Sequence, residues 1–139
     1  MYTKILAGYD GSERAMRAVE EAADLATAVG ASLHLVSACD KANKTHTMGA
    51  SSDVRTLTES EITMDNLNHV ASKFSHLDVT TAVTPGAPAK VIIDEAEASS
   101  ADLIIVGNRH VQGISRVLGS VAEDVAQKAN CAVLISKTA

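Results

Sequence analysis

Short apolar runs alternate with helical patterns along almost the whole chain, and this alternation limits the possible folds more than any other feature. In the segments between the runs, apolar residues recur at three- and four-residue steps, which is typical of amphipathic helices. A strand–helix alternation of this kind predicts a parallel sheet with right-handed crossovers and helices on both faces. The predicted strands cover residues 4–9, 32–38, 77–83, 102–107 and 131–136, and the predicted helices cover 13–29, 53–74, 88–99 and 120–129.

The length and the apolar composition fit one α/β domain over residues 1–139. A chain of 139 residues can bury one continuous core. Hydrophobic residues make up 46% of the chain, but only Tyr2, Tyr9 and Phe74 are aromatic. The core must therefore consist of Ala, Val, Leu and Ile, which suits buried parallel strands covered by helices. We expect a doubly wound five-stranded sheet, Rossmann-like in its layers.

Charge and apolar run lengths exclude several classes of partner. The net charge is −5 and the basic residues are scattered, so we expect no nucleic-acid partner. No apolar run approaches the roughly 20 residues that cross a bilayer, and no signal-peptide layout opens the chain, so we expect no membrane partner. Cys39 and Cys131 stand in no metal-type spacing. A reducing cytoplasmic setting is the simplest expectation.

The segment from residue 40 to 52 is polar and has no apolar periodicity. It predicts a long loop, and loops of this length in small domains are often functional or disordered.

Ligands of doubly wound sheets bind beyond the carboxyl ends of the strands, where the strand order reverses. After the first predicted strand, Asp10 can accept hydrogen bonds from ligand amino or hydroxyl groups; alternatively, Asp10 or Ser12 caps the helix that follows. After the fourth, Gly107 leaves room for a ligand to approach the backbone. Arg109 can pair with a phosphate, or it is a solvated surface arginine.

The last predicted helix begins at Gly119-Ser120, and Ser120 with Glu123 forms a capping-box pattern. The first N–H groups of a helix lack internal partners and carry partial positive charge, so an anion fits there. The alternative is that the capping box only stabilises the start of the helix and that no ligand binds there. Glycines at 107, 113 and 119 favour the ligand.

Several segments spread over the whole chain form a recognisable set: KIL at residues 4–6, DGS at 10–12, residues 33–38, PGAP at 85–88, ADLIIVG at 101–107, GSVAE at 119–123 and CAVLI at 131–135. With these segments the chain resembles the universal stress protein family over its whole length. The resemblance implies a flavodoxin-like fold, a role under stress, a dimer formed through the last strand and, in one branch, ATP binding.

The ATP-binding branch carries Gly, two residues, Gly, nine residues, then Gly-Ser or Gly-Thr. Gly107 and Gly119-Ser120 match the ends of this pattern, but His110 replaces the second glycine and the loop is one residue shorter. Gly113 is a partial substitute. The nucleotide-binding residues that we predict on this basis are Gly8, Tyr9, Asp10, Ala38, Val106, Gly107, Arg109, His110, Gly113, Gly119, Ser120 and Val121.

The predicted function is a stress-response regulator that binds ATP or AMP, with Mg²⁺ accompanying the phosphates, and acts as a dimeric ligand-sensing switch. A cyclic AMP binder and a dimeric interaction module without a nucleotide are the alternatives. We expect no enzyme beyond slow ATP hydrolysis, because the chain has no GxxxxGK[ST] loop, no GxSxG elbow and no HExxH among its five histidines.

Overall fold

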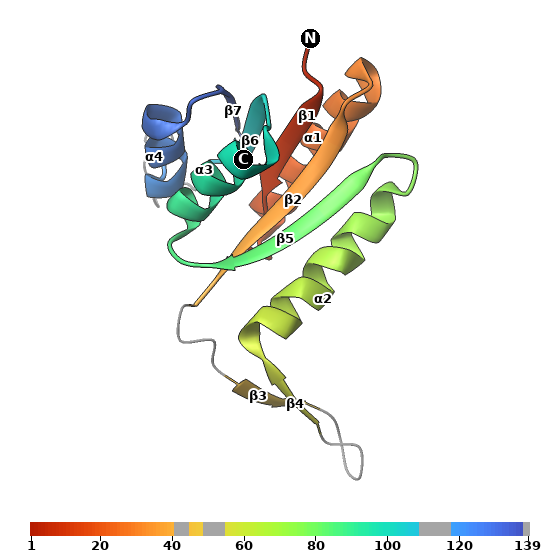
Figure 1. The fold of residues 1–139 in the computed structure, drawn as a ribbon, viewed down its shortest axis with the longest axis vertical. Coiled ribbons are helices and arrows are strands. Elements are labelled where there is room, and N and C mark those ends of the chain that lie inside the picture. The colour runs from red at the N-terminus through yellow and green to blue at the C-terminus, as the bar shows by residue number, and fades with distance from the viewer. Residues whose placement is uncertain (41–44, 49–54, 109–117, 138–139) are drawn as a thin grey trace.

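The computed structural model describes residues 1–40, 45–48, 55–108 and 118–137. Its main sheet has the order β5-β2-β1-β6-β7, and every pairing in it is parallel. The predicted doubly wound five-stranded sheet is therefore confirmed (Figure 1). The strands are β1 Lys4–Gly8, β2 Ser32–Cys39, β5 Val79–Pro85, β6 Leu103–Gly107 and β7 Ala132–Ser136, and the helices between them are α1 Glu13–Val29, α2 Glu59–Ala71, α3 Pro88–Ser99 and α4 Ser120–Lys128.

Helices cover both faces of the sheet, as the sequence predicts. On β1, Ile5 and Ala7 pack in one core cluster with residues of α1 and α2, whereas Leu6 packs in the other cluster with residues of α3 and α4. Successive residues of a strand point to opposite faces, so one strand supplies both clusters. Both clusters are made almost entirely of Ala, Val, Leu and Ile, which agrees with the composition.

The segment between β2 and α2 differs from the sequence-based prediction. The strand β3 Thr45–Met48 lies within the predicted loop, and β4 Arg55–Thr58 lies within the predicted helix of residues 53–74. The two strands pair antiparallel in a small hairpin that extends beyond the sheet at the start of α2 (Figure 1). Residues 41–44 and 49–52 of the predicted loop lie outside the described residues. The strands THTM and RTLT contain β-branched Thr at alternating polar positions, so an apolar pattern could not reveal them.

The second helix starts later than predicted, at Glu59 instead of residue 53, because Thr58 is its N-cap. Thr58 and Glu61 form a capping box in which each side chain accepts from the backbone N–H of the other. The helix ends at Ala71, and a 3₁₀ turn, η2 Ser72–Phe74, completes the predicted segment.

A hydrogen-bonded polar trio around the buried His34 joins the edge strand β5 to its neighbours. His34 on β2 is 7% exposed, and its Nδ1 lies 2.6 Å from Thr80 Oγ1 on β5. Its Nε2 lies 2.9 Å from Glu95 Oε1 on α3. Both ring nitrogens are satisfied, so His34 acts as a cross-link between β5, β2 and α3.

Asp102 ties the start of β6 to the start of β1. Its carboxylate accepts from Thr3 N at 2.9 Å, Thr3 Oγ1 at 3.0 Å and Lys4 N at 3.1 Å. Burial alone would raise the pKa of Asp102, but these hydrogen bonds outweigh it and hold the pKa below the ordinary value of 3.8. In the part of the chain that the structure describes, no helix is both long and apolar enough to cross a membrane.

Candidate functional site

The strand order reverses between β1 and β6, at the centre of the sheet. From β1 the chain crosses to β2 and then β5 on one side, and β6 and β7 follow on the other. The connections that leave β1 and β6 therefore diverge and open a crevice at the carboxyl edge.

A cavity of about 340 Å³ occupies this crevice. Seven of the residues that the sequence analysis predicts for nucleotide binding line it: Gly8, Tyr9, Asp10, Ala38, Val106, Gly107 and Val121. Six lining residues were not among the predicted site residues: Ser12, Arg14, Ala15, Val36, Pro88 and Ile92. The lining thus comes from the ends of β1, β2 and β6 and from the first turns of α1, α3 and α4.

The remaining predicted residues do not line this cavity as described. Gly119 and Ser120 stand at the start of α4, directly before Val121, which does line it. Arg109, His110 and Gly113 lie outside the described residues.

The turn after β1 accommodates both roles that the sequence analysis presents as alternatives, the capping of α1 and hydrogen bonding to a ligand. Ser12 caps α1, because its Oγ accepts from Ala15 N at 3.1 Å. Asp10 Oδ1 accepts from Ser12 N at 2.9 Å and so shapes the turn, in which Gly11 has a φ of +87°. The other carboxylate oxygen of Asp10 has no partner among the described residues. One oxygen therefore holds the turn, and the other is available to a ligand.

Hydrogen bonds between the ends of β1 and β2 hold this side of the cavity in place. Tyr9 N donates to Val36 O at 2.9 Å, and Ser37 Oγ donates to Tyr9 O at 2.7 Å. Ser37 is buried, so the second bond is shielded from water. The positions of Tyr9 and Asp10 are consequently set before any ligand arrives.

The two strand-end glycines have packing roles that the sequence did not indicate. A Cβ on Gly107 would lie 3.2 Å from the carbonyl oxygen of Arg14, so this glycine lets α1 approach β6 closely. Room for a ligand was the sequence-based reason for Gly107, whereas the missing Cβ faces the α1 backbone. A Cβ on Gly8 would lie 2.8 Å from Cδ1 of Ile92, another residue of the cavity wall.

The predicted capping box at Ser120 and Glu123 is wrong. Gly119 is the N-cap, Ser120 is the first helical residue, and no side chain among the described residues caps α4. Instead, the buried Oδ1 of Asn108 accepts from Gly119 N at 2.9 Å. Asn108 N donates to Ser136 O at 3.0 Å, so one residue anchors the end of β6 to β7 and to α4. A helix start without a capping side chain keeps its first N–H groups open to an anion.

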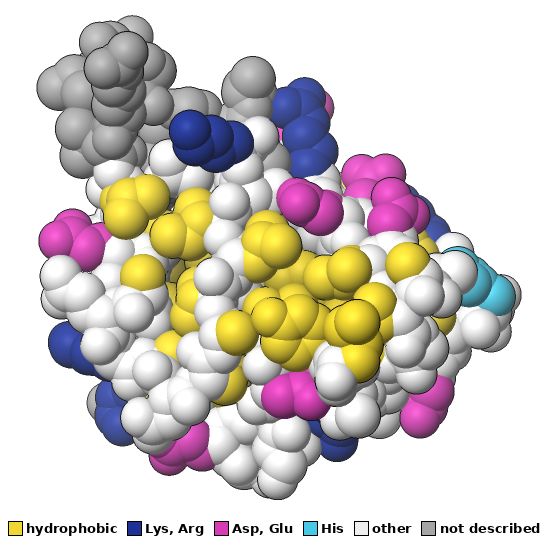
Figure 2. Space-filling model, turned by 90° about the horizontal axis from the view of Figure 1, so that it is seen from above, with side chains coloured by type: hydrophobic (Ala, Val, Ile, Leu, Met, Phe, Trp, Pro, Cys, Tyr) yellow, Lys and Arg dark blue, Asp and Glu magenta, His cyan; other side chains and the backbone are white. Residues whose placement is uncertain are grey.

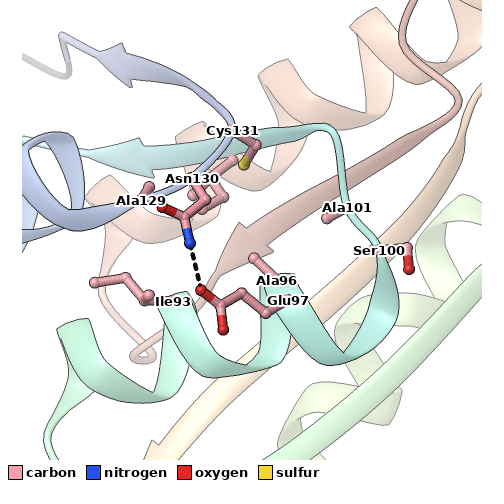
Figure 3. A pocket seen from close by; sticks show the side chains of 9 residues that line it. Ile93, Ala96, Glu97, Ser100, Ala101, Ala129, Asn130 and Cys131 are labelled. Carbon is pink, nitrogen blue, oxygen red and sulfur yellow. Dashed lines mark hydrogen bonds between the residues drawn. The ribbon is translucent and has the colours of Figure 1, made fainter.

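A second, smaller cavity of about 160 Å³ lies near the amino end of β6, between the last turns of α3 and the segment before β7 (Figure 3). Asn130 Nδ2 donates to Glu97 Oε1 at 2.6 Å across it. Burial, and to a smaller extent Asp102, raises the pKa of the Cys131 thiol in its wall, so this thiol is protonated and a poor nucleophile at neutral pH. The larger cavity is the better candidate site.

Comparison with known proteins agrees with this architecture. The model of the universal stress protein family matches residues 1–137. Universal stress protein Rv1636 of Mycobacterium tuberculosis is 31% identical over 146 residues, which cover 99% of this chain and 97% of that protein.

Two solved structures share the fold. A universal stress protein in complex with cAMP is 28% identical, with a TM-score of 0.74, over 99% of this chain and 98% of that chain. The protein MJ0577 is 24% identical, with a TM-score of 0.79, over 100% of this chain and 98% of that chain, and supports the fold alone. With the doubly wound sheet and the match over nearly its full length, the chain belongs to the universal stress protein family.

Proposed function

We propose that the cavity at the carboxyl edge binds an adenine nucleotide and that this binding regulates a stress response. The observation that carries the proposal is the position of the 340 Å³ cavity at the point where the strand order reverses. A relative with the same fold is known in complex with cAMP, which supports an adenine nucleotide as the class of ligand.

The cavity wall matches the two ends of a nucleotide. Val36, Ala38 and Ile92 offer apolar surface to a base. The carboxylate of Asp10 suits the ribose hydroxyl groups or the amino group of adenine. The uncapped start of α4, with Gly119, Ser120 and Val121, suits the phosphates, and Arg109, His110 and Gly113 precede it in the chain. ATP, AMP and cyclic AMP share this chemistry; ATP would bring Mg²⁺ with it.

Calorimetry on nucleotide-free protein tests the proposal. We expect ATP, AMP or cyclic AMP to bind, and Ala38→Leu to weaken binding at least about tenfold, because the longer side chain fills the cavity. Ala98→Leu, at an exposed position of α3, is the matched control and should bind as the wild type does. No detectable heat or thermal shift at millimolar nucleotide would refute nucleotide binding and favour an interaction module without a nucleotide.

We further propose that the protein acts as a dimer assembled through β7 and that ligand binding changes the surface that a partner contacts. The outer edge of β7 pairs with no strand among the described residues, and Val133, Leu134 and Ile135 on it are only half-buried. Figure 2 shows one face of the molecule, seen from above the view of Figure 1, where hydrophobic side chains gather in a broad patch. An unpaired apolar edge strand of this kind is usually covered by another element or pairs with another chain.

The ligand-sensing role needs no chemical step, and we propose slow ATP hydrolysis at most. A phosphate-release assay with Ser120→Ala as the comparison tests this limit. Equal release by both proteins would mean that the phosphate comes from a contaminant.

A further inference from the structure

The large cavity has only two charged residues among its described lining residues, Asp10 and Arg14. Arg14 stands in the first turn of α1 and is half-buried. Its guanidinium forms no hydrogen bond or ion pair with any described residue, and no ion pair joins it to Asp10. A guanidinium stays ionised in proteins, so this group brings an uncompensated positive charge to the cavity wall.

The position of Arg14 is unfavourable for the helix itself. The first turn of a helix carries partial positive charge, so a cation there is repelled, whereas the acidic Glu13 beside it is favoured. Partial burial adds a cost of desolvation for the charge. Neither cost is offset by a partner within the described part of the chain, and an anionic ligand would offset both.

The location also places Arg14 on the phosphate side of the proposed site. The missing Cβ of Gly107 would lie 3.2 Å from the carbonyl oxygen of Arg14, so the first turn of α1 lies directly against the end of β6. From that end the chain leads through Asn108, whose Oδ1 is bonded to Gly119 N at the start of α4. The planar fork of an arginine can bind two oxygens of one phosphate.

We propose that Arg14 pairs with a phosphate of the ligand and is the residue by which the cavity prefers a nucleotide to the free nucleoside. The inference rests on the proposed nucleotide binding and adds a specificity residue to it. Asp10 recognises the nucleoside end, and Arg14 recognises the charge.

Calorimetry with AMP, cyclic AMP and adenosine on the wild type, Arg14→Gln and Arg14→Lys tests this role. Arg14→Gln should bind AMP and cyclic AMP about 10- to 100-fold more weakly, the usual range for a lost charge-assisted hydrogen bond, and adenosine within about twofold of the wild type. Arg14→Lys keeps the charge and should recover part of the loss. Arg17→Gln, on the exposed side of the same helix and outside the cavity lining, is the control and should bind all three as the wild type does.

The outcomes separate this inference from the proposed function. If the wild type binds AMP and Arg14→Gln binds it equally well, the role of Arg14 is refuted while nucleotide binding stands. Equal weakening for AMP and adenosine also refutes it, because the residue would then support the cavity as a whole. If the wild type binds none of the three, nucleotide binding fails and the inference fails with it. The midpoint of thermal unfolding of ligand-free Arg14→Gln should equal or exceed that of the wild type, since an unfavourable charge is removed.

Discussion

At the scale of single residues, Asp102 shows how a side chain outside the ligand cavity sets the stability of the fold. The sheet depends on the pairing of β1 with β6, and Asp102 reinforces it at the amino end through three hydrogen bonds to Thr3 and Lys4. Its lowered pKa means that these bonds favour the ionised form. The stability that it contributes is therefore present above pH 3.8 and is lost as the pH falls through the lower pKa of the folded state.

We predict that Asp102→Asn lowers the free energy of unfolding by about 1 kcal/mol at neutral pH, because the amide cannot accept on both sides. The difference from the wild type should shrink as the pH falls through the lowered pKa of the folded state, because the carboxyl then becomes protonated. Urea denaturation at several pH values measures this. Asp24→Asn, at an exposed position of α1, should show a much smaller effect. A difference that stays constant across this range would contradict the prediction.

Residues near the cavity show which roles a sequence reveals. Gly8, Asp10 and Gly107 follow apolar runs, and strand ends of a parallel sheet meet at one edge, so their neighbourhood could be predicted. The packing reason for Gly107 could not, since it depends on how closely α1 approaches β6. Arg14 and Asn108 give no local signal: one resembles any helix arginine, and the other acts through Gly119, eleven positions away.

At the scale of elements, the start of α2 was the least accurate part of the prediction. Apolar periodicity alone extended this helix back to residue 53, whereas the capping box of Thr58 and Glu61 begins it at Glu59. Helix boundaries depend on such caps and on competing strand pairing, here between β3 and β4, more than on periodicity. The strands of the main sheet lie within two residues of the predicted bounds at each end, and the best buried of them are the largely apolar strands β1, β2 and β6.

We predict that Thr58→Ala lowers the free energy of unfolding by about 1 kcal/mol, because Glu61 N loses its side-chain acceptor. Thr58→Ser keeps the hydroxyl group and should stay within about 0.5 kcal/mol of the wild type. Chemical denaturation followed by circular dichroism compares the three proteins. Equal losses for both variants would mean that the methyl group, and not the cap, stabilises this position.

At the scale of the whole molecule, the strand order determines which two strands form the edges of the sheet and could pair with a second copy of the chain. Both sheet edges, β5 and β7, are open within the described residues, but they differ. The edge strand β5 is cross-linked to β2 and α3 through His34, whereas β7 presents half-buried apolar residues. The sequence indicates an apolar last strand, and the strand order places this strand at an edge of the sheet.

We predict that the wild type behaves as a dimer in light scattering and that Ala132→Glu shifts it toward the monomer. Ala132 is exposed on β7, and a symmetric interface would bring two copies of the new charge together. Ala98→Glu on α3 carries the same charge elsewhere and should leave the mass unchanged. A wild type that is monomeric at millimolar concentration would overturn assembly through β7.

The two hydrogen bonds of Asn108 have a consequence for how the length of the connection after β6 can vary among related chains. By accepting from Gly119 N while donating to Ser136 O, Asn108 fixes both ends of the connection that follows β6. We expect that a residue can be inserted into that connection, or deleted from it, with little change in the sheet or in α4, because both anchoring hydrogen bonds lie outside it. The segment of positions 109 to 118 is one residue shorter here than in the ATP-binding pattern, and we expect its length to be freely exchangeable between relatives. Grafting connections of different lengths between the two anchors is accordingly a route to altered ligand choice on an unchanged scaffold.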